Sequence, residues 1–302
     1  MGMGEDLYKS YPAARDIFDQ ANDLLGFDLA KLCFRGPEGE LDLTEKAQPA
    51  VLTVSIACLK ALNSQLSTLN SQLEAVAGHS LGEYTALVAA GALEFAPALR
   101  LVHKRGQFMK EASEENPGGM MAIIGLSREG VEKVCEESPN EGVVQVANLN
   151  CPGQVVVSGS REDLRRVGEK AKEAGARKVV SLAVSGPFHS SLMRSAAAKL
   201  AREIETLQVR VPEIPFLANV KGDFLSDPSR IKEALISQVS NPVCWEASMR
   251  KILAKGIKSF LEIGPGKVLT GLLRRIDRTA TIYNVEDKGS LERTVDSVTG
   301  KL

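Results

Sequence analysis

A serine in the surroundings of a nucleophile lies in the stretch GHSLG, which runs from Gly78 to Gly82. The G-x-S-x-G spacing is typical of a nucleophile elbow, in which a strand turns sharply into a helix and exposes the serine hydroxyl. Apolar residues before Gly78 and a helix-forming run after Ser80 supply that context, and N–H groups from Leu81 onward could stabilise an oxyanion. A second interpretation stays open, in which Ser80 caps the helix and Glu83 completes a capping box.

Such a serine needs a base, and the chain holds only three histidines, His79, His103 and His189. His79 is adjacent to Ser80, so its side chain should point away, and His103 lies in a basic helical stretch. His189 follows an apolar strand and the break SGP, at a strand end where active sites of α/β sheets gather. We expect His189 to be the base, although it could instead cap the helix that follows it.

A carboxylate to orient this histidine is hard to find. The only aspartate between Ser80 and His189 is Asp163, which begins a charged helix and is a poor candidate. Elbow-type hydrolases place their triad in the chain order Ser–Asp–His. The histidine must therefore be oriented by a glutamate or by an uncharged group.

Arg105 is a charged residue within an apolar helical stripe. It lies three or four positions from four apolar residues, Leu101, Val102, Phe108 and Met109. A buried guanidinium must be paired or must face a polar cavity, and Gly106 beside it allows another element to approach closely. Arg105 could pair with a structural partner such as Glu83, or it could clamp a substrate carboxylate through two hydrogen bonds.

The segment EIGPGKVLTGL, Glu262 to Leu272, has the glycines of a phosphate-binding loop. It lacks the G-x-x-x-x-G-K-[ST] spacing, and neither Ser nor Thr follows Lys267. We expect a tight turn from a strand into a helix, and a minor role near the site stays open.

The composition is that of an ordinary soluble globular protein. The 302 residues are 44% hydrophobic and 25% charged, and the net charge of −1 gives no overall attraction to nucleic acid or to an anionic membrane. No apolar run reaches the roughly 20 residues of a membrane span, and the N-terminus lacks the features of a signal peptide. Five scattered cysteines predict free thiols in the cytoplasm, and three histidines make a His-based metal site unexpected.

The elements that must position these residues alternate along the chain. Helices are predicted over Asp6–Gly26, with a break at Pro12, and from a first turn at Pro49, with a loop over Lys31–Thr44 between them. The tandem LNSQL repeat at 62–66 and 69–73 is interpreted as a lengthened helix end or a surface loop. Four short apolar strands predict a parallel sheet covered by helices: Glu74–Ala77, Pro215–Val220, Ser259–Ile263 and Thr281–Val285.

The stretch from Gly119 to Val184 has a different order, β-α-β-β-α-β, which is the ferredoxin-like pattern. We therefore predict an α/β fold. Its α/β-hydrolase-like large domain, built on the parallel sheet, comprises residues 1–115 and 186–302, and a ferredoxin-like small subdomain, residues 116–185, is inserted between these two halves.

Six motifs, in their order and spacing, resemble the bacterial malonyl-CoA:acyl carrier protein transacylases: GHSLGEY, LVHKRGQFMKEA, ANLNCPGQVVVSG, GPFHSSLM, SNPVCW and EIGPGKVLTGLLRR. The resemblance covers nearly the whole chain. It implies a ping-pong acyltransferase of fatty-acid synthesis, which moves a malonyl group from malonyl-CoA to the phosphopantetheine thiol of acyl carrier protein through a malonyl-serine and without a cofactor. A monomer is the simplest expectation, with no nucleic-acid or membrane partner.

Carried over by position, the resemblance implies that Ser80 is the acylated nucleophile and His189 its base. Arg105 would bind the malonyl carboxylate and hold the acyl group for the incoming thiol, and the Leu81 N–H would be one oxyanion donor. The main-chain carbonyl of Gln238 would orient the histidine, which would explain the absence of an aspartate.

Two further residues are implied at the acyl pocket. Gln48, in the stretch AQPAVL, matches a glutamine that lines the pocket in the family. Phe188 is adjacent to His189, and its ring would leave little room for an α-methyl group, so we expect malonyl to be preferred over methylmalonyl.

The start of the chain departs from the family pattern. Family members begin with an apolar strand and a GQGSQ loop before the segment matching Gly2 to Gly4, where this chain begins. The strand belongs to the central sheet of the family, and the loop supplies its second oxyanion donor. We expect a start site assigned too late or a shortened chain, ahead of a degenerate protein.

Two other classes of function compete with the transferase. A serine hydrolase or thioesterase on a similar core predicts a carboxylate partner for His189, and both the poor placement of Asp163 and the presence of Arg105 argue against it. A non-catalytic binding or scaffold protein predicts that Ser80 forms no covalent adduct with malonyl-CoA.

Overall fold

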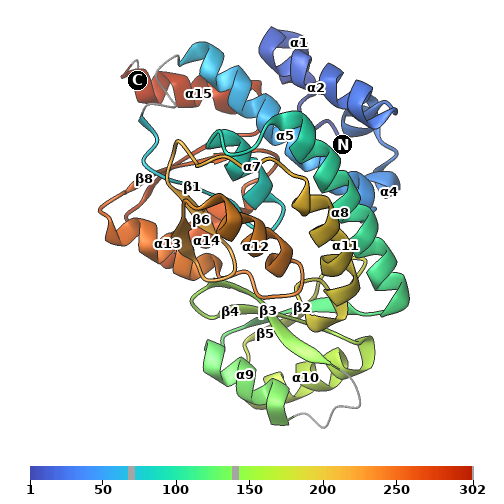
Figure 1. Ribbon diagram of the computed structural model, residues 1–302. Helices are drawn as coiled ribbons and strands as arrows, with labels where there is room; N and C mark the ends of the chain where they lie inside the picture. The colour runs from blue at the N-terminus through green and yellow to red at the C-terminus, as the bar shows by residue number, and fades with distance from the viewer. Residues whose placement is uncertain (67–71, 138–142, 301–302) are drawn as a thin grey trace.

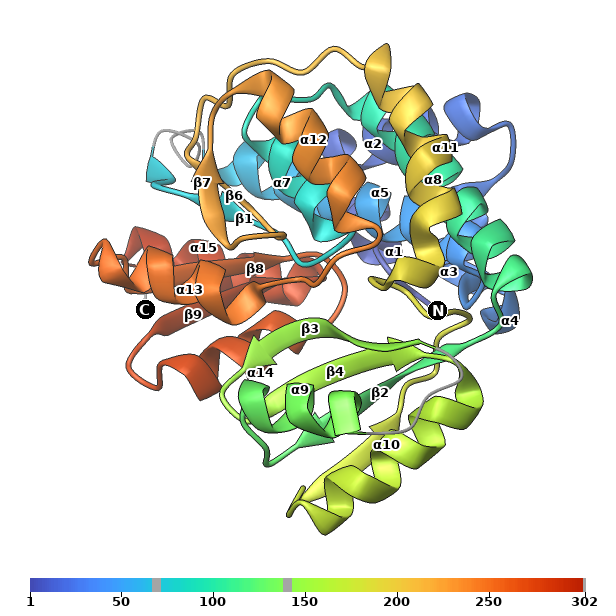
Figure 2. The ribbon, with the colours of Figure 1, turned by 60° about the horizontal axis from the view of Figure 1, so that its bottom comes forward.

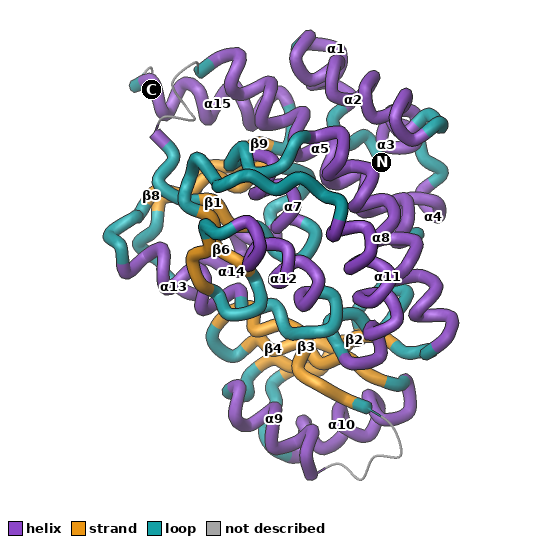
Figure 3. The backbone as a smooth tube through the Cα atoms, viewed as in Figure 1, coloured by secondary structure: helices purple, strands orange, loops and turns teal. Residues whose placement is uncertain are grey.

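The computed structural model describes residues 1–66, 72–137 and 143–300. Figure 1 shows a larger, mostly helical part and a smaller part in which two helices cover the outer face of a sheet. Figure 2 shows the other face of that sheet turned toward the larger part, and Figure 3 shows the strands of the larger part enclosed by helices. No helix of the described residues is both long and apolar enough to cross a membrane.

The N-terminal part of the chain is helical, and its helices are α1 Glu5–Ser10, α2 Pro12–Leu25, α3 Leu29–Arg35, α4 Glu38–Leu41 and α5 Thr44–Gln65. The predicted break at Pro12 is confirmed, because it falls between α1 and α2. The predicted loop over Lys31–Thr44 is wrong. Asp28 caps α3 by accepting the Lys31 N–H at 2.8 Å, and one face of α3 is buried.

The helix predicted to start at Pro49 begins earlier, at Thr44, so Pro49 lies inside α5. The first copy of the LNSQL repeat ends this helix, as one interpretation predicted, whereas most of the second copy lies outside the described residues. α5 is buried almost throughout its length and packs against α2 and α8 (Phe95–Glu115). It forms the centre of the largest hydrophobic core.

The single parallel sheet predicted from four strands is not formed by the described residues. β1 (Val76–Ala77) pairs in parallel with β6 (Phe216–Ala218), which also pairs in antiparallel fashion with β7 (Asp223–Leu225). β8 (Ser259–Ile263) pairs in parallel with β9 (Thr281–Val285) as a separate sheet, because no ladder joins β8 to the short β1. Both sheets nevertheless pack on one core, through Val76 of the first and Leu261 of the second.

The remaining helices of the larger part follow or cover these strands. They are α7 Gly82–Ala89, α11 Arg194–Glu205, α12 Pro228–Gln238, α13 Trp245–Ala254, α14 Val268–Ile276 and α15 Lys288–Thr299. α7 is the first helix after β1, as predicted for the run that follows Ser80, and it ends at Ala89. Asp227 caps α12 by accepting the Arg230 N–H at 2.9 Å, which fixes the start of the helix that ends at Gln238.

The order of elements predicted for Gly119 to Val184 is observed. It runs β2 Gly119–Ile124, α9 Arg128–Glu137, β3 Val144–Cys151, β4 Gln154–Gly159, α10 Arg161–Glu173 and β5 Lys178–Ser181. The strands form one antiparallel sheet in the order β3-β4-β2-β5. Val131 of α9 and Val167 of α10 are buried with the strand residues in one hydrophobic cluster.

The smaller sheet is tied to the larger part through its edge strand β3. Val243 donates its N–H to the Ala147 carbonyl and accepts the Leu149 N–H, both at 2.9 Å. Val243 lies five residues after the end of α12 at Gln238. The edge of the smaller sheet is therefore hydrogen-bonded to the segment that leads away from α12.

Candidate active site

Ser80 lies on a sharp turn between β1 and α7. Its φ angle is 51°, in the left-handed region that side chains with a Cβ rarely adopt. A Cβ atom on Gly78 would lie 1.9 Å from the Gly82 carbonyl oxygen, so the turn closes only with glycine at position 78. The turn does not need glycine at position 82 for space, because a Cβ on Gly82 would meet no atom within 4 Å.

The interpretation of Ser80 as a helix cap is wrong. Leu81 occupies the N-cap position of α7, and no side chain caps that helix. The Ser80 hydroxyl instead lies 2.8 Å from His189 Nε2, and Arg105 Nη2 donates to the same oxygen at 3.1 Å. Ser80 Oγ is thus held between a ring nitrogen and a guanidinium.

His189 is buried and is oriented by a main-chain oxygen. Its Nδ1 lies 2.8 Å from the Gln238 carbonyl oxygen, which can only accept, so Nδ1 carries the proton and Nε2 is left to accept the Ser80 hydroxyl. Burial and the nearby Arg105 charge lower the pKa of His189 to about 3, so the ring is neutral near pH 7. The capping interpretation of His189 is wrong, because Ser190 is the N-cap of the following 3₁₀ turn, Ser191–Met193.

No carboxylate among the described residues bonds to His189. Asp163, the one aspartate between Ser80 and His189, accepts the Ser160 hydroxyl at 2.6 Å and lies at the start of α10 in the smaller part. The His189 ring therefore has a neutral dipole, rather than a charge, on its Nδ1 side.

Arg105 has one of the largest fully buried side chains, with 2% of its surface exposed. Its guanidinium donates to Gln48 Oε1 at 2.5 Å, to Gln238 Oε1 at 2.8 Å and to the Ser80 hydroxyl. The structural ion pair with Glu83 that remained open is not formed. Arg105 is instead surrounded by neutral oxygens, with the Tyr84 ring centre 5.6 Å away.

The close approach predicted at Gly106 is confirmed. A Cβ on Gly106 would lie 2.7 Å from Glu45 Cα and 2.8 Å from the Thr44 carbonyl oxygen at the start of α5. This contact brings α8 onto α5, so that Arg105 of one helix reaches Gln48 of the other.

Asn219, at the end of β6, was not predicted as a site residue. Its Oδ1 accepts the Ser80 N–H at 2.7 Å, and its Nδ2 donates to the Gly78 carbonyl at 2.6 Å, so one amide holds both sides of the turn. The sequence could have indicated it, because Asn219 is a polar residue directly after an apolar strand. Ligands of parallel sheets bind at such strand ends. Because Asn219 occupies the Ser80 N–H, the Leu81 N–H is the adjacent group without an acceptor among the described residues.

Glu83 lies one helical turn after Ser80 and is fully buried. Its carboxylate accepts the Asn219 N–H at 3.1 Å and a hydrogen bond from Gln238 Nε2. Burial raises the pKa of Glu83 to about 7, although these hydrogen bonds and the charge of Arg105 act in the opposite direction. Glu83 is therefore part of the site but contacts neither the Ser80 hydroxyl nor the guanidinium.

Phe188 and His79 both contact the smaller part of the molecule. Phe188 is half-buried and packs on Met120, Ala147 and neighbouring residues of the smaller sheet. His79 points away from Ser80, as expected: its Nε2 lies 2.9 Å from Asn150 Oδ1 of β3, and its ring lies at a tilt beside that of Trp245, with the ring centres 5.7 Å apart.

The EIGPG segment is a strand-to-helix turn, as predicted. Glu262 accepts the N–H groups of Leu269 and Thr270 at 2.9 and 2.7 Å, and so caps α14. Gly264, with a φ of 116°, packs against Ser55 of α5. No group of three or more metal-ligating side chains occurs in the described part of the chain.

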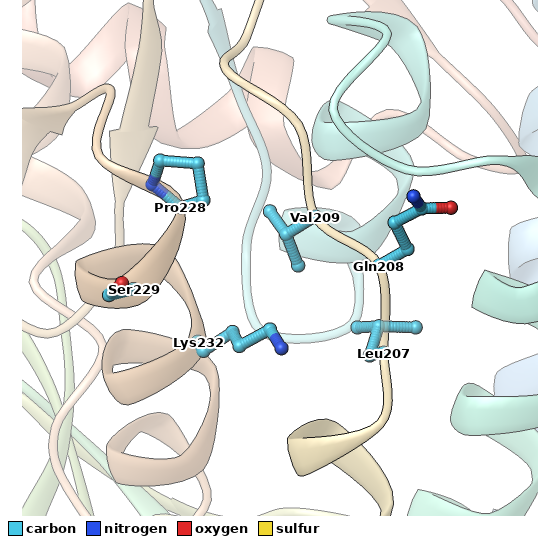
Figure 4. A pocket seen from close by; sticks show the side chains of 6 residues that line it. All are labelled: Leu207, Gln208, Val209, Pro228, Ser229 and Lys232. Carbon is cyan, nitrogen blue, oxygen red and sulfur yellow. The ribbon is translucent and has the colours of Figure 1, made fainter.

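Two surface hollows lie apart from these residues. Figure 4 shows one of about 360 Å³ between the segment after α11 and the start of α12, lined by Leu207, Val209, Pro228 and Lys232 among others. The second, of about 400 Å³, lies between β9, α14 and α15. Neither is lined by Ser80, His189 or Arg105.

A serine hydroxyl that bonds a neutral histidine and a buried guanidinium is an arrangement suited to acyl transfer, and the chain is similar to known acyltransferases. The acyl transferase domain family matches residues 1–297, and the chain belongs to that family. Its relatives include the malonyl CoA-acyl carrier protein transacylase of Bacillus subtilis, 44% identical over 99% of this chain and 93% of the relative. The enzyme of the same name in Escherichia coli is 41% identical over 98% of this chain and 95% of the relative.

Solved structures agree in fold. The malonyl CoA-acyl carrier protein transacylase of Coxiella burnetii superposes with a TM-score of 0.94 at 38% identity, over 99% of this chain and 94% of that one. A malonyl-transacylase solved in complex with its type II polyketide acyl-carrier protein gives a TM-score of 0.92 at 40% identity, over 98% of this chain and 95% of that one. The chain thus has the mixed α/β fold of these enzymes.

Proposed function

We propose that this protein transfers a malonyl group from malonyl-CoA to the phosphopantetheine thiol of acyl carrier protein. One observation carries the proposal. A buried guanidinium that forms no ion pair with any described carboxylate donates to the hydroxyl of a serine that also bonds a neutral histidine. Such a site suits an acyl group that bears its own carboxylate. The malonyl transacylases named above support the same substrate.

In the first half-reaction, Ser80 Oγ attacks the thioester carbonyl of malonyl-CoA while its proton moves to His189 Nε2. The C–S bond then breaks, and the CoA sulfur leaves with that proton, so a malonyl ester remains on Ser80. In the second half-reaction, the phosphopantetheine thiol gives its proton to His189 and attacks the ester. Ser80 regains a proton as it leaves, and the site returns to its starting state.

Arg105 is proposed to bind the malonyl carboxylate through its guanidinium, whose Nε–H has no partner among the described residues, with Gln48 lining the pocket beside it. Holding the acyl group at one position through both half-reactions favours attack by a positioned thiol. The Leu81 N–H is proposed as an oxyanion donor, since no acceptor among the described residues occupies it. The Gln238 carbonyl is proposed to keep His189 in the tautomer that accepts a proton.

Phe188 remains a proposed determinant of malonyl over methylmalonyl, through its position next to His189. We further propose that residues 1–115 and 186–302 form an α/β-hydrolase-like domain and residues 116–185 a ferredoxin-like subdomain, supported by the sheet order β3-β4-β2-β5. A monomer in the cytoplasm is proposed for the protein, in keeping with five cysteines that are free thiols.

The proposal is tested by intact-mass spectrometry of the full chain after mixing with malonyl-CoA. We expect one malonyl adduct, absent from the Ser80→Ala variant because the nucleophile is gone. A hydrolase would instead release free malonate without an acyl acceptor. A binding or scaffold protein would show no adduct, and either result would contradict malonyl transfer through Ser80.

A further inference from the structure

We propose that Glu83 is a positioning residue, which fixes the Gln238 side chain so that Arg105 stays available to a carboxylate-bearing acyl group. The inference rests on the proposed malonyl transfer and adds a residue that sets acyl-group specificity. Glu83 does not touch the reacting atoms. It acts through one buried amide, which lies between its carboxylate and the guanidinium.

The Gln238 amide is held on its nitrogen side by three acceptors. Its Nε2 donates to the Glu83 carboxylate, to the Ser80 carbonyl oxygen at 2.9 Å and to Asn219 Oδ1 at 3.5 Å. Its Oε1 accepts from Arg105 Nη2 at 2.8 Å. With a carboxylate and a carbonyl on one side and a cation on the other, only this orientation of the amide pairs donors with acceptors.

Rotation of the amide by half a turn would reverse every contact. Its NH₂ group would then face the guanidinium of Arg105, and its oxygen would face the oxygens of Glu83 and Ser80. Groups left unpaired in a buried position carry a large desolvation penalty. The Glu83 oxygen that accepts from Gln238 Nε2 therefore fixes which end of Gln238 is presented to Arg105.

Glu83 also acts electrostatically on Arg105, whose charge lowers the pKa of the Glu83 carboxyl, without forming an ion pair with it. The three hydrogen bonds of the guanidinium go to the side-chain oxygens of Gln48, Gln238 and Ser80, all of which are neutral. A direct pair would have to be broken before a substrate carboxylate could bind. With Gln238 placed between Glu83 and the guanidinium, Arg105 forms no ion pair, and its Nε–H, which has no partner among the described residues, is left for that carboxylate.

The test compares acylation of Ser80 by malonyl-CoA and by acetyl-CoA, which lacks the carboxylate, using the full chain and intact-mass kinetics. In Glu83→Gln, an NH₂ group replaces one of the two carboxylate oxygens. Those oxygens accept hydrogen bonds from the Asn219 N–H and from Gln238 Nε2, so one of these donors would then face another donor. We expect the malonyl rate to fall by about 10- to 100-fold, while the acetyl rate falls much less. The matched control is Glu262→Gln, which removes a carboxylate that caps α14 and should leave the malonyl-to-acetyl ratio unchanged.

The Arg105→Ala background separates positioning from a merely structural role. If Glu83 acts through the guanidinium, Glu83→Gln should not change the malonyl-to-acetyl ratio further in that background. An equal loss of both acyl groups in Glu83→Gln, or a further change in the ratio without Arg105, would overturn the inference. Should Glu83→Gln fail to fold, Glu83→Asp, which draws the carboxylate back from Gln238, must lower the ratio, and an unchanged ratio would overturn it.

The outcomes also distinguish this inference from the function on which it rests. If the unchanged chain takes no malonyl group from malonyl-CoA, the proposed transfer fails and the role of Glu83 fails with it. If the unchanged chain is malonylated and Glu83→Gln keeps the same malonyl-to-acetyl ratio, only the role of Glu83 is overturned.

Discussion

At the scale of single residues, the main feature is a histidine oriented by a carbonyl dipole. The Gln238 carbonyl holds His189 Nδ1–H as an aspartate would in a triad, but it adds no full negative charge to the imidazolium formed during attack. The Arg105 charge further disfavours that imidazolium. The proton is therefore expected to pass quickly to the leaving thiolate, which suits exchange between two thioesters.

The low pKa of His189 gives a pH prediction. Because burial and Arg105 lower the pKa to about 3, the ring stays in its neutral, proton-accepting form well below the usual histidine pKa of about 6.5. The rate of Ser80 malonylation, measured by rapid quench and intact mass, should therefore show no loss on going from pH 7.5 to about pH 5.5. A half-maximal rate between pH 6 and 7 would contradict a desolvated His189 as the base.

Residue types and spacing predicted Ser80, His189 and Arg105, because each is chemically out of place in its local sequence. Gln48 and Gln238 came only from the family resemblance, since a glutamine in a helix has no distinctive pattern. Glu83 and its partners could not be predicted as a network. The hydrogen bond between Glu83 and Gln238 joins positions 155 residues apart, which only the folded chain brings together.

At the scale of elements, the turn from β1 into α7 holds Ser80, the proposed nucleophile, in a strained conformation. Ser80 has a positive φ angle, and the amide of Asn219 bonds to the backbone on both sides of it. Asn219 follows β6, and the end of that strand was not predicted as part of the site. Loss of either hydrogen bond from Asn219 should relax the turn and misplace the Ser80 hydroxyl.

Gly78→Ala tests that turn, because its Cβ would lie 1.9 Å from the Gly82 carbonyl oxygen. Neither backbone can retreat without moving Ser80, so we expect the free energy of unfolding to fall by about 1–3 kcal/mol or more and malonylation to be lost. Chemical denaturation and intact mass measure the two effects. Gly82→Ala is the stability control, since its Cβ meets no atom within 4 Å, and equal destabilisation by both variants would contradict the account.

Elements with a long periodic pattern were predicted well, whereas short ones were not. The sequence of the smaller part has a clear apolar and polar pattern in each of its two helices and four strands, and all six elements are observed. The sequence over most of α3 and all of α4 predicts a loop because glycines, a proline and charges dominate it. The pairing of β1, two residues long, depends on tertiary contacts that its own sequence does not encode.

At the scale of the whole molecule, the site joins segments from both halves of the larger part. Gln48 comes from α5, Arg105 from α8, His189 from the segment after β5, and Gln238 from the end of α12. The smaller sheet is hydrogen-bonded to the chain just beyond Gln238, through Val243. The position of the His189 partner is therefore tied to how the two parts of the molecule pack.

The central claim is that Arg105 selects an acyl group by its carboxylate, and full transfer from acyl-CoA to acyl carrier protein tests it most directly. Arg105→Ala should lower transfer of malonyl by about 100-fold or more, because a charge-assisted bidentate contact is lost, while transfer of acetyl is retained or gained. The product is measured as acylated carrier protein by mass spectrometry. Malonyl transfer that is unchanged in Arg105→Ala, in a protein with the unfolding transition of the unaltered chain, would contradict the account.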